Sequence, residues 1–484
     1  MFPNNFDKDH AVKIFIITAF IFGFTGGYFL HGTLGMAGEG SSGYYEKLSI
    51  FNNVLGYVRD SYVDEEKLDP EELIYGAIDG MLQTLDDPYT ELMRPEGYQE
   101  MQTQTTQEFG GLGIYITIEN EELTVIAPID GTPAYEAGVM PGDVITHIEG
   151  ESTEEITQTS EAVEKLRGEP GTNVEITVER PGETLDLTIT RDTIPIESVR
   201  SRNITYEDRS VGYIQIANFG SQTGEEMREA LEELHEDNFE GLILDMRGNP
   251  GGLLNSAYEV ANIWIDEGDI VKTRGRSGQQ NQEFGASAEG TEPDYPMMVL
   301  VDGGSASGSE IVAGALKDHG RAIVAGDTSF GKANVQSVFP LDDGSALKLT
   351  TARYFTPDDH KIHDQGIPPH LPVKQDYPDT EEREQINRLN SGDTVLNFVR
   401  ENPDPSDEEI DQFIEKLRED GFTLDEEFIR FEIYRQQQAR EGRRAVRSPA
   451  TDPQLERALS LFHSSLDVQP WEVQSVLELL DSEQ

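Results

Sequence analysis

The chain has 484 residues, and because a domain usually holds roughly 100 to 200 residues, we expect several domains. Hydrophobic residues make up 36% of the chain and 46 residues are glycine, a globular composition that excludes a wholly disordered protein. The formal net charge of −55 repels phosphate backbones, so no nucleic-acid partner is expected.

The N-terminus carries a candidate membrane segment. Residues 11–30 contain a single charge, Lys13, and approach the roughly 20 apolar residues that span a bilayer. Lys13 and the preceding Lys8 favour a cytoplasmic N-terminus and an exported remainder. A cleaved signal peptide ending near residues 35–37 and a buried core helix are the alternatives. We expect residues 1–36 to form a single-pass signal anchor, with the rest of the chain outside the cytoplasm, in the periplasm.

The spacing of apolar residues divides the remaining chain into regions of predicted helix and regions of predicted strand. Residues 37–104 show helical spacing that is broken at Asp69-Pro70 and Asp87-Pro88, which predicts an N-terminal helical segment. Short β-branched runs follow, and they predict strands at 113–118, 123–126, 174–178 and 185–189 around a helix at 160–166.

From residue 196 to residue 374, apolar strands alternate with helical patterns, which is typical of an α/β layer. Residues 375–484 are polar, acidic and helical in pattern, and we expect them to form a C-terminal helical extension. In the α/β part we predict strands at 211–216, 242–244 and 298–301 and helices at 224–235 and 307–317.

A glycine-rich phrase, Phe109-Gly-Gly-Leu-Gly-Ile114, stands directly before a predicted strand, so several main-chain N–H groups can bind one carboxylate. Together with the phrase at residues 131–145, it resembles a PDZ domain, here over residues 105–195; a generic β-barrel is the alternative. The resemblance implies that protein or peptide substrates bind by their C-termini as an added strand. The implied binding residues are Gly110, Gly111, Leu112, Gly113 and Ile114.

A second glycine-rich phrase, residues 302–311, lies between a predicted strand and a predicted helix. Such a turn exposes a side chain and directs main-chain N–H groups at it. Ser305, Ser307 and Ser309 all lie in this turn, and local physics does not choose a nucleophile among them. The alternative is a helix cap, because Glu310 stands three residues after Ser307 as in a capping box.

A serine nucleophile needs a base, and no His-Asp pair stands in an obvious relation to this turn. Lys332 lies in a glycine turn before a strand, where burial would lower its pKa and let it accept a proton. The alternative is an ion pair with one of the many carboxylates. His360 and His363, with Asp364, lack a further metal ligand, so no metal and no cofactor are expected.

The phrases around Ser307, at 330–336 and at 244–252 resemble the C-terminal processing peptidases, tail-specific serine proteases with a Ser-Lys dyad. The resemblance covers residues 44–373 and implies a crotonase-like α/β catalytic domain over residues 196–374. It implies that Ser307 is the nucleophile, that Lys332 is the general base and that Gln336 orients the lysine.

The same resemblance implies supporting groups around this dyad. The N–H groups of Gly252 and Gly308 would hold the oxyanion, and Glu310 would support the site without touching the substrate. Gly308 replaces the commoner alanine, which keeps the N–H group but loosens the turn. We expect Arg247 and Asp245 to brace the loop before Gly252 through an ion pair.

These features together predict a membrane-anchored extracytoplasmic serine endopeptidase that recognises protein C-termini through a PDZ domain and forms an acyl-enzyme. The alternative is a PDZ scaffold with an inactive protease domain, against which the intact Ser307, Lys332 and Gln336 argue. Assembly into a homo-oligomer stays open.

The acidic residues are spread over the whole chain, which predicts a solvated, halophilic type of surface. We expect the melting temperature to fall as salt is lowered below ~0.15 M, where the Debye length exceeds about 8 Å and self-repulsion is less screened. A melting temperature that stays constant across a potassium chloride series would contradict this salt adaptation.

Overall fold

A computed structural model describes residues 41–373, apart from 120, 121, 130 and 181, and residues 380–482, apart from 392–393, 441–446, 448, 450–451 and 469–471. The expected signal anchor, residues 1–36, lies outside these described residues. Within the described ranges, no helix has the length and apolar character needed to cross a bilayer. The chain divides into two compact units, residues 1–86 and 87–484.

The first unit is helical over its described residues. The Asp69 carboxylate accepts hydrogen bonds from the main-chain N–H groups of Glu71 and Glu72, at 2.8 and 3.3 Å, and so begins a helix. Pro70 occupies the first position of that helix, where a missing N–H group needs no partner. The predicted separation of helices at Asp69-Pro70 is therefore confirmed. The elements are α2 (Ser41–Ser61), the 3-10 helix η1 (Glu65–Lys67) and α3 (Pro70–Gln83).

In the second unit, residues 108–195 form a small β domain with its own hydrophobic core. Along β7 (Asn173–Arg180), the buried Val174, Ile176 and Val178 alternate with more exposed residues, which places one face of the strand in this core. The predicted strands and the predicted helix of this region are confirmed. The sheet order is β3 (Ile114–Glu119), β4 (Glu122–Pro128), β5 (Val144–Ile148), β7 and β8 (Glu183–Thr190), with β6 (Glu151–Ser152) beside β5.

The strand β3 lies at an edge of this sheet, because β4 is its one partner among the described strands. The helix α6 (Thr159–Leu166) contacts β3. The short helix α5 (Pro133–Glu136) precedes β5. The strands β2 (Glu108–Gly111) and β9 (Asp192–Pro195), at the two ends of the domain's sequence, pair antiparallel with each other. An extended peptide could therefore pair with the free edge of β3 as an additional strand.

The largest part of the second unit is built on a six-stranded sheet. Its central strands are parallel, and β10 adds antiparallel to β11 at one edge. The apolar strands predicted at 211–216, 242–244 and 298–301 are confirmed. The sheet order is β10 (Val199–Tyr206), β11 (Arg209–Ile216), β12 (Gly241–Asp245), β15 (Met297–Val301), β16 (Ile323–Gly326) and β19 (Leu371–Pro372).

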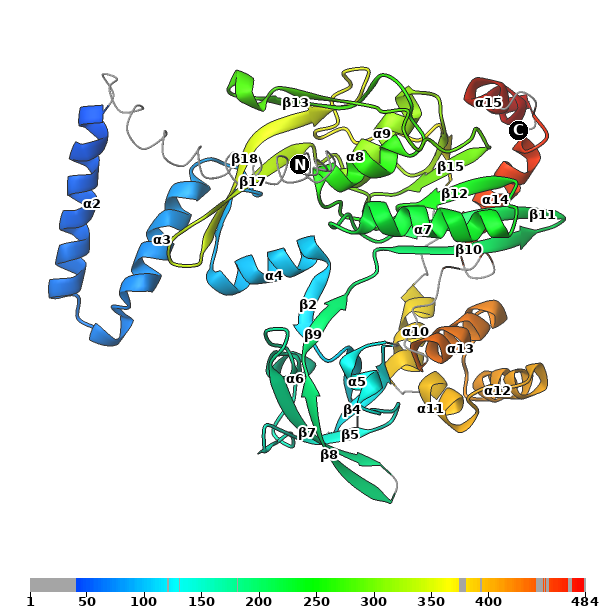
Figure 1. Ribbon diagram of the computed structural model, residues 1–484, viewed down its shortest axis with the longest axis horizontal. Coiled ribbons are helices and arrows are strands. Elements are labelled where there is room, and N and C mark those ends of the chain that lie inside the picture. Colours follow the sequence, from blue (N-terminus) through cyan, green and yellow to red (C-terminus); the bar gives the residue numbers. More distant parts are fainter. Residues whose placement is uncertain are drawn as a thin grey trace, which may run out of the picture. The chain divides into compact units, whose positions relative to one another are not determined.

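Helices cover both faces of this sheet (Figure 1). One face packs against α7 (Thr223–Glu236), α8 (Leu254–Asn262) and α9 (Gly308–Asp318). The other face packs against α14 (Pro453–Ser465) and α15 (Val473–Ser482), which belong to the expected C-terminal extension. The last helices of the chain are thus part of the core around the central sheet.

A second sheet carries the strand that follows Lys332. That strand, β17 (Asn334–Pro340), pairs with β18 (Ala346–Phe355), and the register shifts between Val335 and Gln336. The same sheet contains β1 (Glu91–Met93), β13 (Asp269–Gly275) and β14 (Gln282–Gly285). The helix α4 (Pro95–Thr106) and the 3-10 helix η2 (Gly278–Gln280) complete this part.

The first helices of the C-terminal region have a separate hydrophobic core, which includes Leu389, Val399, Phe413 and Ile429. The predicted helical character of residues 375–484 is confirmed over its described residues. These helices are α10 (Thr380–Ser391), α11 (Thr394–Glu401), α12 (Asp407–Glu419) and α13 (Glu426–Arg440).

Candidate active site

Ser307 has a main-chain conformation that non-glycine residues rarely adopt. Its φ is 55° and its ψ is −111°, directly before α9. Such strain persists only where neighbouring groups hold it, and it is concentrated at functional sites. Here the main-chain N–H of Ala306 donates to the Asn249 carbonyl at 2.9 Å, and the N–H of Ser307 donates to Glu310 Oε2 at 2.8 Å.

The hydrogen bonds of the turn distinguish the three candidate serines. Ser305 Oγ donates to the Met246 carbonyl at 2.8 Å, and Ser309 Oγ donates to the Asn249 carbonyl at 3.0 Å. Both serines are fully buried. Among the described residues, no main-chain carbonyl accepts a hydrogen bond from the Ser307 hydroxyl, so the geometry favours Ser307 as the nucleophile, a choice that the sequence alone left open.

Glu310 connects the loop of Ser307 to the loop of Lys332. Its Oε1 accepts hydrogen bonds from Ser329 Oγ at 2.6 Å and from the Gly331 N–H at 2.7 Å. Its Oε2 accepts from the N–H groups of Ser307 at 2.8 Å and Lys332 at 2.9 Å. The carboxylate is fully buried. One side chain therefore fixes the main chain on both sides of the reaction centre.

The Lys332 side chain is half-buried beside two tyrosines. Its amine lies over the ring of Tyr89, 4.6 Å from the ring centre. Its carbonyl accepts a hydrogen bond of 2.5 Å from the Tyr354 hydroxyl, which also neighbours the Ser307 side chain. In the described part of the chain, no hydrogen bond joins the Lys332 amine to the Ser307 hydroxyl. The amine must therefore move toward the serine before it can accept a proton.

The surroundings of Lys332 favour its neutral form. Burial lowers the pKa of Lys332 below its ordinary value, and the Lys348 ammonium lowers it further. The carboxylates of Glu91 and Glu310 act in the opposite direction. Burial is the largest of these effects, as the sequence argument requires of a lysine base.

Of the two polar side-chain atoms of Gln336, one makes a hydrogen bond and the other makes none within the described residues. Its Nε2 donates to Thr350 Oγ1 at 2.7 Å, while its Oε1 is buried without a hydrogen-bond partner. No hydrogen bond joins Gln336 to Lys332 among the described side chains. The orienting role of Gln336 stays a prediction, and its free buried oxygen is an acceptor of the kind that role requires.

The loop before α8 approaches Ser307 at Gly251, and the next residue, Gly252, supplies a candidate N–H donor. A Cβ atom on Gly251 would lie 2.5 Å from Ser307 Cβ, and one on Gly252 would lie 2.0 Å from the Phe219 carbonyl oxygen. Only glycine allows this close approach. In the described residues, the N–H groups of Gly252 and Gly308 donate no hydrogen bond. Two unpaired donors beside a nucleophile form a candidate oxyanion hole.

The packing of Gly308 differs from the sequence argument. A Cβ atom there would lie 2.8 Å from Phe219 Cδ2 and 3.3 Å from Ala257 Cβ. The ring of Phe219 occupies the space that the commoner alanine would need. The glycine therefore permits close packing against Phe219 and does not merely loosen the turn.

Asn249 and Arg247 stabilise this glycine loop through buried hydrogen bonds and an ion pair. Asn249 Oδ1 accepts from the Gly251 N–H at 2.8 Å, and Asn249 Nδ2 donates to the Ile216 carbonyl at 3.0 Å. The expected ion pair between Arg247 and Asp245 is present, at 2.6 Å, and both side chains are fully buried. The further partners of Arg247 come from the C-terminal region, and no local sequence pattern predicts them.

In the β domain, the glycine phrase has the properties of a carboxylate-binding loop. Gly110 lies so close to the Gly168 carbonyl that a Cβ atom would approach its oxygen to 2.0 Å. Gly113 has a φ of 74° and packs against Thr132. The N–H groups of Leu112 and Gly113 donate no hydrogen bond in the described residues. They lie just before Ile114, the first residue of the edge strand β3.

The histidines near residue 360 do not converge on one point. His360 Nδ1 lies 3.4 Å from Asp318 Oδ1, and His363 Nε2 lies 3.6 Å from Asp364 Oδ2. They therefore face different carboxylates.

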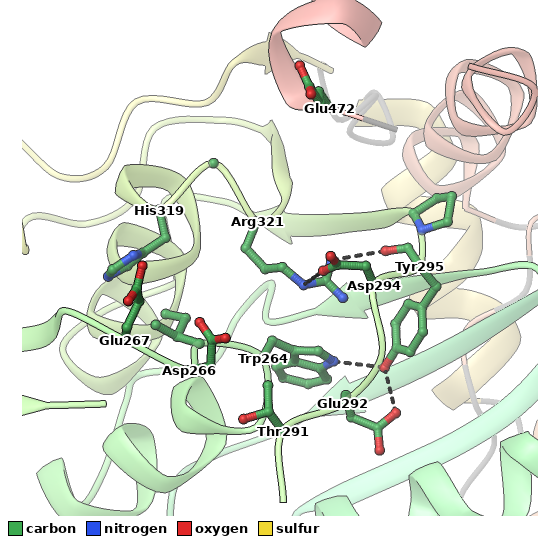
Figure 2. A pocket seen from close by; sticks show the side chains of 13 residues that line it. Trp264, Asp266, Glu267, Thr291, Glu292, Asp294, Tyr295, His319, Arg321 and Glu472 are labelled. Atoms are coloured by element: carbon green, nitrogen blue, oxygen red, sulfur yellow. Dashed lines mark hydrogen bonds and ion pairs between the residues drawn. The ribbon is translucent and has the colours of Figure 1, made fainter. Parts of the chain in front are cut away.

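A pocket of about 800 Å³ lies at the other end of α9 and contains none of the predicted site residues (Figure 2). Among its lining groups, Trp264 Nε1 donates to the Tyr295 hydroxyl at 2.8 Å and Arg321 Nη1 donates to the Tyr295 carbonyl at 3.0 Å. In the described part of the chain, Thr291 Oγ1 and Arg321 Nε are buried without a hydrogen-bond partner.

Three family models match the sequence. Peptidase family S41 matches residues 210–373, a PDZ domain matches residues 124–180, and the N-terminal domain of the activating protease CtpB matches residues 33–97.

Proteins with these features are similar over most of the chain. The carboxy-terminal-processing protease of Bartonella bacilliformis is 40% identical over 341 residues, which cover 69% of this chain and 77% of that protein. The carboxyl-terminal-processing protease of Synechocystis is 41% identical, covering 66% of this chain and 75% of that protein. Among solved structures, the photosystem II D1 C-terminal processing protease has 30% identity and a TM-score of 0.40, covering 67% of this chain and 92% of that one.

We expect Glu310→Gln to destabilise the second unit by about 2 to 4 kcal/mol, because an NH2 group would replace one acceptor oxygen among four buried donors. Urea unfolding followed by tryptophan fluorescence measures this loss. The matched control is Glu409→Gln in the exposed Ser406–Glu409 capping box, which should lose less. Equal losses in both variants would show that Glu310 is an ordinary helix cap.

Proposed function

Because the chain belongs to peptidase family S41, as a carboxy-terminal processing protease, it is a serine peptidase, and we propose that it cleaves by a Ser-Lys mechanism. The observation that carries the mechanism is the strained Ser307, which lies beside the loop of Gly251 and Gly252. Within the described part of the chain, its hydroxyl donates to no main-chain carbonyl and the N–H groups of Gly252 and Gly308 donate no hydrogen bond. Lys332 is the base, because its main chain is tied to the same carboxylate and its pKa is lowered by burial.

In the first half of the reaction, Ser307 Oγ attacks the carbonyl carbon of the scissile peptide bond while Lys332 Nζ takes the hydroxyl proton. The carbonyl oxygen gains negative charge and accepts hydrogen bonds from the N–H groups of Gly252 and Gly308. The tetrahedral intermediate then collapses, the C–N bond breaks, and Lys332 gives the proton to the departing amine.

In the second half, a water molecule attacks the acyl-enzyme ester and Lys332 takes a proton from the water. The same two N–H groups stabilise the second oxyanion. The ester bond breaks, the proton returns to Ser307 Oγ, and a new C-terminal carboxyl group is released.

We further propose that the substrate is held by its C-terminus in the PDZ domain. The unpaired N–H groups of Leu112 and Gly113 would bind the terminal carboxylate, and the peptide would pair with the free edge of β3. The apolar residues 11–30 after Lys8 support a membrane anchor with the catalytic part outside the cytoplasm. Protease digestion of intact cells, with an epitope at the C-terminus, tests that orientation.

We expect Ser307→Ala to abolish cleavage of a fluorogenic peptide with a free C-terminus, whereas Ser305→Ala and Ser309→Ala keep measurable activity. The two control hydroxyls donate to main-chain carbonyls of the neighbouring loop, so their loss can loosen that loop but removes no group that attacks the substrate. Full activity of Ser307→Ala would show that the nucleophile is a different group.

The pH profile tests Lys332 as the base. The neutral amine is the active form, so activity should fall as pH drops through the pKa of Lys332, below the ordinary value of about 10.4. Lys348→Met removes a neighbouring positive charge and should move this acid limb to higher pH. Glu91→Gln removes a negative charge and should move it to lower pH.

The control for this profile is Lys332→Arg, which should be inactive at every pH because a guanidinium does not give up its proton. An acid limb that stays in place in both Lys348→Met and Glu91→Gln would identify another titrating group.

A further inference from the structure

The C-terminal helices reach the loop that carries the oxyanion donor. Arg247 begins that loop, and its guanidinium is fully buried. Arg247 Nη1 donates to Asp452 Oδ1 at 3.0 Å and to Gln454 Oε1 at 2.7 Å. Arg247 Nη2 donates to Asp452 Oδ2 at 2.8 Å and to Asp245 Oδ2 at 2.6 Å.

With Arg247 Nε bound to Asp245, at 3.0 Å, each of the five guanidinium N–H donors has an acceptor. Three of these bonds go to the C-terminal segment. A buried guanidinium depends on such complete pairing, because each unpaired donor would lose its hydration without compensation. Arg247 therefore cannot keep this position without Asp452 and Gln454.

Asp452 and Gln454 are themselves held in place. Asp452 caps α14 by accepting a hydrogen bond from the Leu455 N–H at 2.9 Å. Gln454 Nε2 donates to the Val373 carbonyl at 2.6 Å. Although burial alone would raise the pKa of Asp452, its hydrogen bonds with Arg247 bring the pKa below the ordinary value, so the carboxylate is charged. The C-terminal segment thus presents a rigid, charged acceptor to Arg247.

The main chain next to Arg247 is bonded to both halves of the candidate oxyanion hole. The Met246 carbonyl accepts from Ser305, two residues before Ser307. Asn249 accepts from the Gly251 N–H with its side chain and from the Ala306 N–H with its carbonyl. A shift of Arg247 would therefore move the Gly252 and Gly308 donors relative to each other.

We propose that Asp452 is a positioning residue for the peptidase reaction: it fixes Arg247 so that the Gly252 N–H points at the forming oxyanion. The inference rests on the proposed function, because it needs Gly252 as an oxyanion donor. The C-terminal helices are then part of the catalytic machinery, although they contribute no group that touches the substrate.

A misplaced oxyanion donor reduces the stabilisation of the transition state and leaves the binding of the ground-state substrate unchanged. Removing a whole donor costs about 100- to 1000-fold in kcat, and a displaced donor should cost less. We expect Asp452→Asn to lower kcat by about 10-fold or more while KM changes by less than about twofold. Asp452→Glu, which keeps the carboxylate, should recover part of the loss.

The matched control is Asp467→Asn. Asp467 lies in the same C-terminal segment and pairs with Arg209 of β11 at 2.5 Å, away from the oxyanion loop. This variant removes a charge and an ion pair from the same segment without touching Arg247, so its kcat should stay at the wild-type value. An equal drop in kcat in both aspartate variants would overturn the proposal in favour of a general effect of C-terminal docking.

A peptide aldehyde gives a second readout, since it forms a tetrahedral adduct with a serine nucleophile, whereas the product peptide binds without bond formation. In Asp452→Asn, the affinity for the aldehyde should fall by the same factor as kcat, and the affinity for the product peptide should not change. Wild-type kcat and wild-type aldehyde affinity in a folded Asp452→Asn protein would overturn the proposal.

If Asp452→Asn shows no cooperative melting, Gln454→Met answers the same question, because it removes one bond to Arg247 and keeps the helix cap at Asp452. An unchanged kcat in that variant would also overturn the proposal. Ser307→Ala is assayed in parallel: activity there would refute the mechanism itself, whereas an inactive Ser307→Ala beside a fully active Asp452→Asn would refute only the positioning role.

Discussion

The buried carboxylate of Glu310 is the interaction on which the site depends. Four donors surround it, three of them main-chain N–H groups, and their hydrogen bonds stabilise the buried carboxylate. It therefore fixes the main chain at Ser307 and at Lys332, while in the described residues its carboxylate makes no hydrogen bond with the side chain of either residue. This explains how the two loops can be rigid while the lysine amine lies over Tyr89 and away from the serine hydroxyl.

The central sheet supplies the second constraint. The strands β12 and β15 are parallel neighbours, so the loops that follow them leave the sheet at the same edge. One loop carries Gly252 and the other carries Ser307, and Asn249 bonds them together. Phe219 packs against both Gly252 and Gly308, which is why each of these positions excludes a side chain. Phe219 thus shapes both donors of the candidate oxyanion hole, with its main chain at Gly252 and with its ring at Gly308.

Much of the fold follows from sequence periodicity, because β11, β12, β15, α7 and α9 bury regularly spaced apolar residues. The choice among three serines does not follow, since it depends on carbonyls of Met246 and Asn249, about 60 residues away in the chain. The partnership of Arg247 with Asp452 spans 205 residues and leaves no local pattern. The conformational freedom of glycine predicted a loose turn at Gly308, whereas in the structure the ring of Phe219 packs closely against this glycine. The expected membrane segment, residues 1–36, lies outside the described residues.

The cover that α14 and α15 give to the central sheet has a consequence for biosynthesis. Ribosomes make the chain from its N-terminus, so β10 to β19 are complete about 80 residues before the helix that shields their second face begins. Until then, an apolar surface including Ile243, Met298 and Leu300 is uncovered and the Arg247 guanidinium lacks its distant carboxylate. During synthesis, the loop that begins with Arg247 therefore lacks its partner until Asp452 and α14 have emerged from the ribosome.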